Sequence, residues 1–131
     1  MRIVRMMTMI ACLVVVASLL WAISWSDSQN KYILSGEEAA FYDSTTCKGK
    51  PAMAMVSSQY QSNLALLNVP EGGNWNDRIS CIETGPNASV KVCTDANLKG
   101  KCMSISGSRM MSLSGNSTYN NKISSIKKPA Q

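Results

Sequence analysis

The feature that most constrains the fold is an eight-residue stretch that occurs twice. WNDRISCI, residues 75–82, aligns without a gap with YNNKISSI, residues 119–126, at an offset of 44. A second pair of segments, AFYDSTTCKGK at 40–50 and KVCTDANLKGK at 91–101, aligns at an offset of 51. The chain therefore contains two related units, and the first unit has seven additional residues between its two landmarks.

The two units, over 38–84 and 88–128, both show the pattern of short antiparallel strands. Apolar and polar residues alternate in segments such as SVKVC and NKISSIK, which places the valines and isoleucines on one face. No segment after residue 30 keeps a helical period over a useful length. Two units of about four strands each predict an all-β domain over 38–128, a sandwich of two Greek keys.

An apolar segment precedes this domain. Residues 6–25 carry no charge and follow Arg2 and Arg5. As a helix they would span about 30 Å, enough to cross the hydrocarbon core of a bilayer. Basic residues before such a segment hold the N-terminus in the cytoplasm and direct the rest of the chain across the membrane. We therefore expect an N-terminal apolar helix and a domain that faces outward.

Two interpretations of residues 1–25 stay open. One is a cleaved signal peptide, for which residues 22–24, Ala-Ile-Ser, offer a weak cleavage site. The other is a retained transmembrane anchor, in which Trp25 would lie at the membrane interface. Both predict an extracytoplasmic location, either secreted or periplasmic or anchored through residues 6–25, and both leave residues 26–37 as a polar linker.

The cysteines favour disulfides over a metal site. Cys12 lies in the apolar segment and is expected to be free, whereas four cysteines remain in the small exported domain. They are separated by 33, 11 and 8 residues, which does not match the close C-x2-C pairs of a four-cysteine zinc site. The four are Cys47, Cys81, Cys93 and Cys102.

Composition argues against catalysis and against nucleic-acid binding. The chain has no histidine, which removes Ser-His-Asp and Cys-His catalysis and histidine-ligated zinc. Adjacent acids such as Glu37 and Glu38 would point to opposite faces of a strand. The net charge is +5, but the longest basic run is Lys127–Lys128 and aromatic residues are few. We therefore expect a non-enzymatic protein without a nucleic-acid partner.

The repeat resembles the motif of the βγ-crystallins. Units of that family open with an aromatic, four residues, an aromatic, any residue and Gly, and they close with Asn/Asp-Asn/Asp-x-x-Ser/Thr-Ser. The closing box is complete in NNKISS, 120–125, and lacks only its last serine in NDRISC, 76–81. The opening box is degraded, but Gly49 and Gly100 stand at its hairpin position. The resemblance covers 38–128 and implies a βγ-crystallin-like sandwich of the bacterial exported type.

The resemblance also implies weak calcium binding. In calcium-binding relatives, oxygen atoms of the closing box act together with backbone carbonyls of the partner unit's hairpin, and such hard ligands suit a hard cation. Carried over to this chain, the candidates are Asp77 and Ser80 in one site and Asn121 and Ser124 in the other. The alternative is that these residues only close turns and satisfy strand ends.

A disulfide pairing follows from the same resemblance. In the family, the last serine of the closing box lies against the folded hairpin of its own unit. The first unit has a cysteine at both places, Cys81 in the box and Cys47 in the hairpin, whereas the second unit has neither. The resemblance therefore implies a Cys47–Cys81 bond, which leaves Cys93 to pair with Cys102.

We consider two main functions. The first is an extracytoplasmic domain that is structural or binds calcium weakly. The second is a secreted protein-binding module, because some small, disulfide-bonded relatives inhibit metallopeptidases and others act as toxins against competitors. In that case residues 57–60 would present a loop, with Tyr60 and Trp75 as the anchors for a protein partner. The alternative for both aromatics is packing in the core or at a sheet edge. Binding to carbohydrate or to the cell envelope is a third possibility, which rests on location alone.

Overall fold

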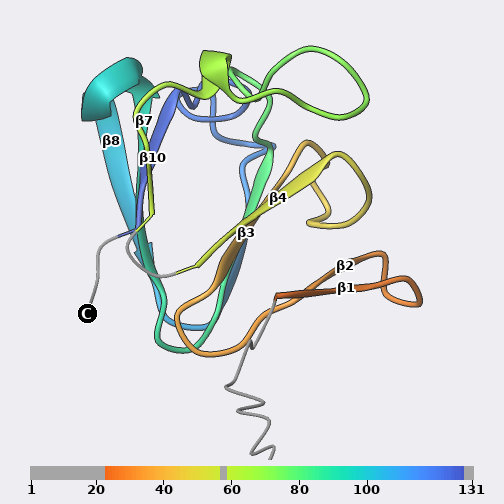
Figure 1. Ribbon diagram of the computed structural model, residues 1–131. Helices are drawn as coiled ribbons and strands as arrows, with labels where there is room; N and C mark the ends of the chain where they lie inside the picture. Colours follow the sequence, from red (N-terminus) through yellow and green to blue (C-terminus); the bar gives the residue numbers. More distant parts are fainter. Residues whose placement is uncertain (1–22, 57–58, 129–131) are drawn as a thin grey trace, which may run out of the picture.

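The computed structural model describes residues 23–56 and 59–128, and it contains two four-stranded antiparallel sheets (Figure 1). The first sheet has the order β4 (Ala52–Met55), β3 (Ala39–Tyr42), β6 (Cys81–Thr84) and β9 (Arg109–Ser112). The second has the order β5 (Tyr60–Gln61), β10 (Ser125–Lys127), β7 (Ser89–Asp95) and β8 (Lys99–Ser106). The prediction of an all-β fold is confirmed.

Helix is almost absent from the part of the chain that the structure describes. It consists there of two 3-10 turns of three residues each, η1 (Leu64–Leu66) and η2 (Ala96–Leu98). Among these residues no helix has the length and apolar character needed to cross a membrane. The apolar helix expected at 6–25 lies outside the described residues, apart from residues 23–25.

The two units exchange one strand each. β5 belongs to the first unit but pairs with β10 of the second, with Gln61 opposite Ile126. In the same way β9 belongs to the second unit and pairs with β6 of the first, with Met111 opposite Ile82. The exchange ties the two sheets together, so neither unit completes its own sheet.

The core lies between the two sheets and is built largely from the repeat. The four isoleucines of the two eight-residue stretches are fully buried, and burial of one such side chain contributes about 1.5–3 kcal/mol. Trp75 is also part of this core, with only 3 % of its surface exposed. The prediction of Trp75 as a surface anchor is therefore wrong, because its ring is packed among apolar side chains. The isoleucines are Ile79, Ile82, Ile123 and Ile126.

Residues 24–33 form a hairpin instead of the linker predicted for 26–37. β1 (Ser24–Ser26) pairs with β2 (Lys31–Ile33), and the hairpin lies beside the first sheet in Figure 1. The ring of Trp25 meets the ring of Tyr32 edge-on, with 5.0 Å between centroids. Both rings pack against the buried group around Tyr42. The polar residues that read as a linker are the turn of this hairpin, and Trp25 belongs to the domain.

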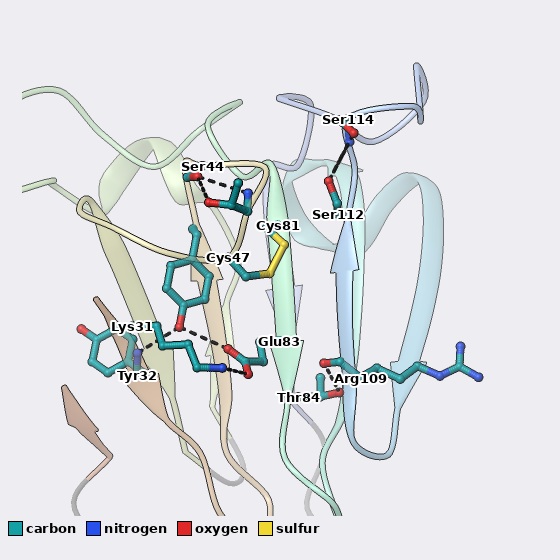
Figure 2. The surroundings of a disulfide bond; sticks show 12 residues. Lys31, Tyr32, Ser44, Cys47, Cys81, Glu83, Thr84, Arg109, Ser112 and Ser114 are labelled. Atoms are coloured by element: carbon teal, nitrogen blue, oxygen red, sulfur yellow. Dashed lines mark hydrogen bonds and ion pairs between the residues drawn. A yellow bond between two sulfur atoms is a disulfide. The ribbon is translucent and has the colours of Figure 1, made fainter. Parts of the chain in front are cut away.

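Both predicted disulfides are present. Cys47 is bonded to Cys81 with 5.1 Å between their Cα atoms, and Figure 2 shows this bond beside β6. Cys93 is bonded to Cys102, which stands directly opposite it on the neighbouring strand. Cys12 lies outside the described residues.

Most of the seven additional residues form a loop of their own. The backbone N–H of Leu64 donates to the carbonyl of Ser124, and the N–H of Leu113 donates to the carbonyl of Ser80, the equivalent serine of the other unit. Leu64 and Leu113 are therefore equivalent positions, and the offset between the units is 49 here. At Trp75 and Tyr119 the offset has fallen to 44. The loop between Leu67 and Trp75 accounts for the change, and it is closed by a bridge between Asn68 and Asn74.

Candidate functional site

The two closing boxes lie against each other. The backbone N–H of Asp77 donates to the carbonyl of Ile123, and the N–H of Asn121 donates to the carbonyl of Ile79, both at 3.1 Å. The two bonds are equivalent under the repeat, because in each the second residue of one box donates its backbone N–H to the isoleucine carbonyl of the other box. The boxes therefore form one reciprocal structure at the contact between the units.

The backbone explains why Asp and Asn stand at the second box position. Asp77 has φ +55° and Asn121 has φ +52°, which is the left-handed region. Asn and Asp tolerate this region better than other residues that carry a side chain. The residue type at this position is therefore required by the turn, whether or not it also binds a ligand.

The side chains of the boxes form hydrogen bonds across the units, whereas the sequence grouped the candidates within each box. Ser124 Oγ lies 3.5 Å from Asp77 Oδ1. Ser80 Oγ donates to Asn121 Oδ1 at 2.6 Å. The four candidates thus come together as Asp77 with Ser124 and Ser80 with Asn121, because the two boxes run past each other.

The basic residues of the two boxes are bound elsewhere. Arg78 donates to Asp43 Oδ2 from both Nε and Nη2, at 3.2 and 2.9 Å, and to the carbonyl of Gly72. Lys122 Nζ donates to the carbonyl of Ser117 at 2.8 Å. Both cations therefore have partners other than the four candidate ligands.

The two pairs differ in what they offer a cation. Asp77 and Ser124 bring a carboxylate and a hydroxyl together, and the hydrogen bond between them is long, at 3.5 Å. Ser80 is buried, and its hydroxyl already donates to Asn121 in a pair without a carboxylate. Within the described ranges, no three Asp, Glu, Cys or His residues come together as a metal cluster. The Asp77–Ser124 pair fits a hard cation, with a single formal charge to hold it.

A second polar group joins the hairpin to the first sheet. Lys31 Nζ contacts Glu83 Oε1 at 2.7 Å, a pair visible in Figure 2. The hydroxyl of Tyr42 donates to Glu83 Oε2 at 3.4 Å and accepts from the backbone N–H of Tyr32 at 3.0 Å. The pKa of Tyr42 is raised to about 12, chiefly by burial; the bond from the Tyr32 N–H lowers it, and the nearby Glu83 carboxylate raises it. Burial also raises the pKa of Tyr32.

A hollow of about 380 Å³ opens between this hairpin and the outer face of β6 and β9. The Lys31–Glu83 pair lies in its wall, and the exposed side chains of Ile33 and Met110 border it. None of the residues singled out from the sequence lines it, since the sequence suggested only a linker at this place.

Of the two predicted anchors, only Tyr60 is at the surface. It lies at the start of β5, an edge strand, with 47 % of its surface exposed. The loop predicted at 57–60 is described only from Gln59 onward, and the backbone carbonyl of Gln59 accepts from the N–H of Lys128 at 2.8 Å. Tyr60 stays a candidate for contact with a partner.

The fold matches solved βγ-crystallin structures. A βγ-crystallin domain from Flavobacterium johnsoniae is 27 % identical, with a TM-score of 0.56 over 71 % of this chain and 94 % of that one. An archaeal βγ-crystallin is 22 % identical, with a TM-score of 0.53 over 72 % and 99 %. A domain from Clostridium beijerinckii is 17 % identical, with a TM-score of 0.56 over 72 % and 100 %.

The similarity to βγ-crystallins is found by comparing structures and not by comparing sequences. No protein-family model matches the chain, and no curated protein matches it. Of the opening boxes, only the glycines and one aromatic remain. The closing boxes, the exchanged strands and the structural matches agree, and the described part of this chain is a βγ-crystallin-like domain.

Proposed function

We propose that the protein is a non-enzymatic, extracytoplasmic βγ-crystallin-like domain that binds one calcium ion weakly at Asp77 and Ser124. The observation that carries the proposal is the meeting of a carboxylate and a hydroxyl from different units, 3.5 Å apart. An ion held by both would join the two units, so calcium would stabilise the folded domain. The two disulfides support the location, because such bonds persist in oxidising compartments.

The expected affinity is low. Asp77 is the only acidic side chain of the two boxes, and the Ser80–Asn121 pair is already closed by a hydrogen bond. Extracellular calcium modules of low charge have Kd values of about 10⁻⁴–10⁻³ M. At ten times Kd, binding to the folded state alone stabilises it by about 1.4 kcal/mol.

Thermal unfolding of the full chain with calcium, and with magnesium as the control ion, tests this proposal. Asp77→Asn is the sharpest variant, because asparagine tolerates the left-handed backbone and has the same shape without the charge. We expect it to abolish the calcium-specific rise in melting temperature while the melting temperature without calcium stays near that of the wild type.

Asn121→Ser is the matched control at the equivalent position. It should lower the melting temperature without calcium, because of its positive φ, and leave the calcium-dependent rise in place. A wild-type protein without any calcium-specific shift would contradict the proposal and leave the boxes as turn-closing devices. A shift that is lost in Asn121→Ser and kept in Asp77→Asn would place the ion at the other pair.

A further inference from the structure

A row of four residues crosses the outer face of the second sheet. Tyr60 on β5 stands opposite Lys127 on β10, and Lys127 stands opposite Lys91 on β7. Lys91 in turn stands opposite Ser104 on β8. All four side chains are exposed. Three strand spacings separate the ends of the row, about 14 Å in all.

The centre of the row places two like charges side by side. Directly opposite residues on antiparallel strands have Cβ atoms about 4.5–5.5 Å apart, and like charges at that distance are destabilising. Neither Lys91 nor Lys127 forms an ion pair with any residue in the described part of the chain, where the ion pairs are Lys31–Glu83 and Arg78–Asp43.

The one acid on the four strands of this sheet is Asp95, which stands opposite Lys99 beyond the bulge of β7 and so has a cation of its own as register partner. The register pairs on either side of Lys91 and Ser104 that share their alternation are Ser89 with Ser106 and the disulfide of Cys93 with Cys102. The two ion pairs of the described residues, Lys31–Glu83 and Arg78–Asp43, both lie outside the second sheet, so neither offsets the charge of Lys91 and Lys127. Such a surface is complementary to an anion that bridges the two ammonium groups.

We propose that this face, made of Tyr60, Lys127, Lys91 and Ser104, binds an acidic polysaccharide. Carboxylate or sulfate groups of the polymer bind between Lys91 and Lys127 and relieve their repulsion. A sugar ring packs on the exposed face of Tyr60, whose ring is apolar on its faces and polar at its tip. Ser104 offers a hydroxyl to the sugar at the other end of the row.

Two other polyanions fit the face less well. An anionic membrane surface would favour Leu, Phe or Trp side chains that insert between lipids, and on these four strands Tyr60 is the only large aromatic or aliphatic side chain that is strongly exposed. Single-stranded nucleic acid is held by successive aromatic residues on which bases stack, and the row has one. The flat, hydroxyl-bearing face with one aromatic at its end favours a saccharide.

Binding of fluorescent polygalacturonate fragments to the full chain in a non-ionic detergent tests the proposal. Unlabelled polygalacturonate, neutral dextran, duplex DNA and phosphatidylglycerol micelles serve as competitors. The variant Lys91→Ser/Lys127→Ser removes the charge pair. The matched control, Lys48→Ser/Arg109→Ser, removes the same charge from two exposed residues that lie outside the second sheet.

We expect the Lys91/Lys127 variant to bind about tenfold more weakly and its salt dependence to fall by about one unit of log–log slope per lysine. The control should weaken binding less than about twofold, since distant exposed charges are screened. Tyr60→Ala should weaken binding with the salt dependence unchanged, and Tyr60→Phe should bind like the wild type. Polygalacturonate should compete and dextran should not.

Three results would overturn the proposal. The first is no binding of polygalacturonate by the wild type. The second is an equal loss in the two double variants, which would show that only net charge matters. The third is stronger competition by DNA or by phosphatidylglycerol micelles than by polygalacturonate, which would assign the face to another polyanion. Melting temperatures of all variants are measured alongside, so a loss caused by unfolding is recognised.

Discussion

The hydroxyl of Ser125 accepts a hydrogen bond from the backbone N–H of Leu98 at 3.0 Å, at the place where the first unit has the Cys81–Cys47 bond. The hairpin positions are equivalent in backbone as well, with φ +56° at Leu98 and +54° at Cys47. Ser125 also donates to the carbonyl of Asp95 at 2.6 Å. One unit thus fastens its folded hairpin covalently and the other with hydrogen bonds.

Replacement of the disulfide by the second unit's residues, in Cys47→Leu/Cys81→Ser, should lower the free energy of unfolding. Opening a loop of 34 residues costs about 4 kcal/mol in the chain-entropy model, and a new hydrogen bond from residue 47 to the serine returns about 1 kcal/mol. Urea unfolding measures the difference. For comparison, Cys93→Ser/Cys102→Ser opens a loop of only 9 residues and should cost about 3 kcal/mol. With the returned hydrogen bond, both variants should lose about 3 kcal/mol, and a Cys47→Leu/Cys81→Ser protein as stable as the wild type would contradict the loop argument.

Gly100 is the hairpin glycine whose replacement should be most damaging. It has φ +74°, and a Cβ atom there would lie 2.7 Å from Asp95 Cγ and clash with the hydroxyl of Thr94. Gly107 has nearly the same φ, +73°, but its Cβ would have no neighbour within 4 Å. We expect Gly107→Ala to cost about 1–2 kcal/mol from backbone strain, and Gly100→Ala to cost more because its hairpin must also shift. Equal losses in urea unfolding would show that the close approach is unimportant.

Much of the fold was predictable from the repeat, because its apolar positions are the buried isoleucines and its glycines lie in the hairpins. The Cys47–Cys81 pair was predictable through the resemblance to the βγ-crystallins, which implies that the last closing-box residue lies against the folded hairpin of its own unit. The pairing of Asp77 with Ser124 was not, because spacing within one box cannot show that two boxes run past each other.

Two other errors have a common physical cause. The sequence predicts a linker where the structure has the hairpin at 24–33, because a short polar turn between two brief strands has the composition of a linker. Trp75 was proposed as an anchor for a partner beside the alternative of core packing, and its burial selects the core. In both cases the outcome depends on contacts with residues far along the chain, which local composition does not contain.

Tyr42 should make the domain less stable above pH 10. Its pKa is raised to about 12 in the folded protein, chiefly by burial, from an ordinary value of 10.0. A raised folded pKa gives a stabilising contribution that is fully present below pH 10 and is lost as the pH rises toward 12. Tyr42→Phe should be less stable than the wild type at pH 8, by about 1 kcal/mol from lost hydrogen bonds, and this gap should narrow between pH 10 and 12.

Urea unfolding across that pH range provides the measurement for Tyr42. Tyr60→Phe serves as control, since it removes an exposed tyrosine from the other sheet, and its curve should run parallel to that of the wild type. A constant gap between wild type and Tyr42→Phe from pH 8 to 12 would show that Tyr42 ionises in the folded state as readily as in the unfolded chain.

Lys91→Glu should stabilise the domain while it destroys the charge pair of the second sheet. The new carboxylate would stand directly opposite Lys127, where an opposite-charge pair contributes about 0.2–1 kcal/mol and a like-charge pair does the reverse. Lys91→Gln is the neutral control and should give a smaller gain. Urea unfolding at low salt measures both, and the gain of Lys91→Glu should shrink as salt is added, because these charges are exposed. If Lys91→Glu were no more stable than Lys91→Gln, the two lysines would not repel each other in the folded protein. Natural retention of a less stable arrangement fits a face that meets an anion, and the same variant should lose its binding to polygalacturonate.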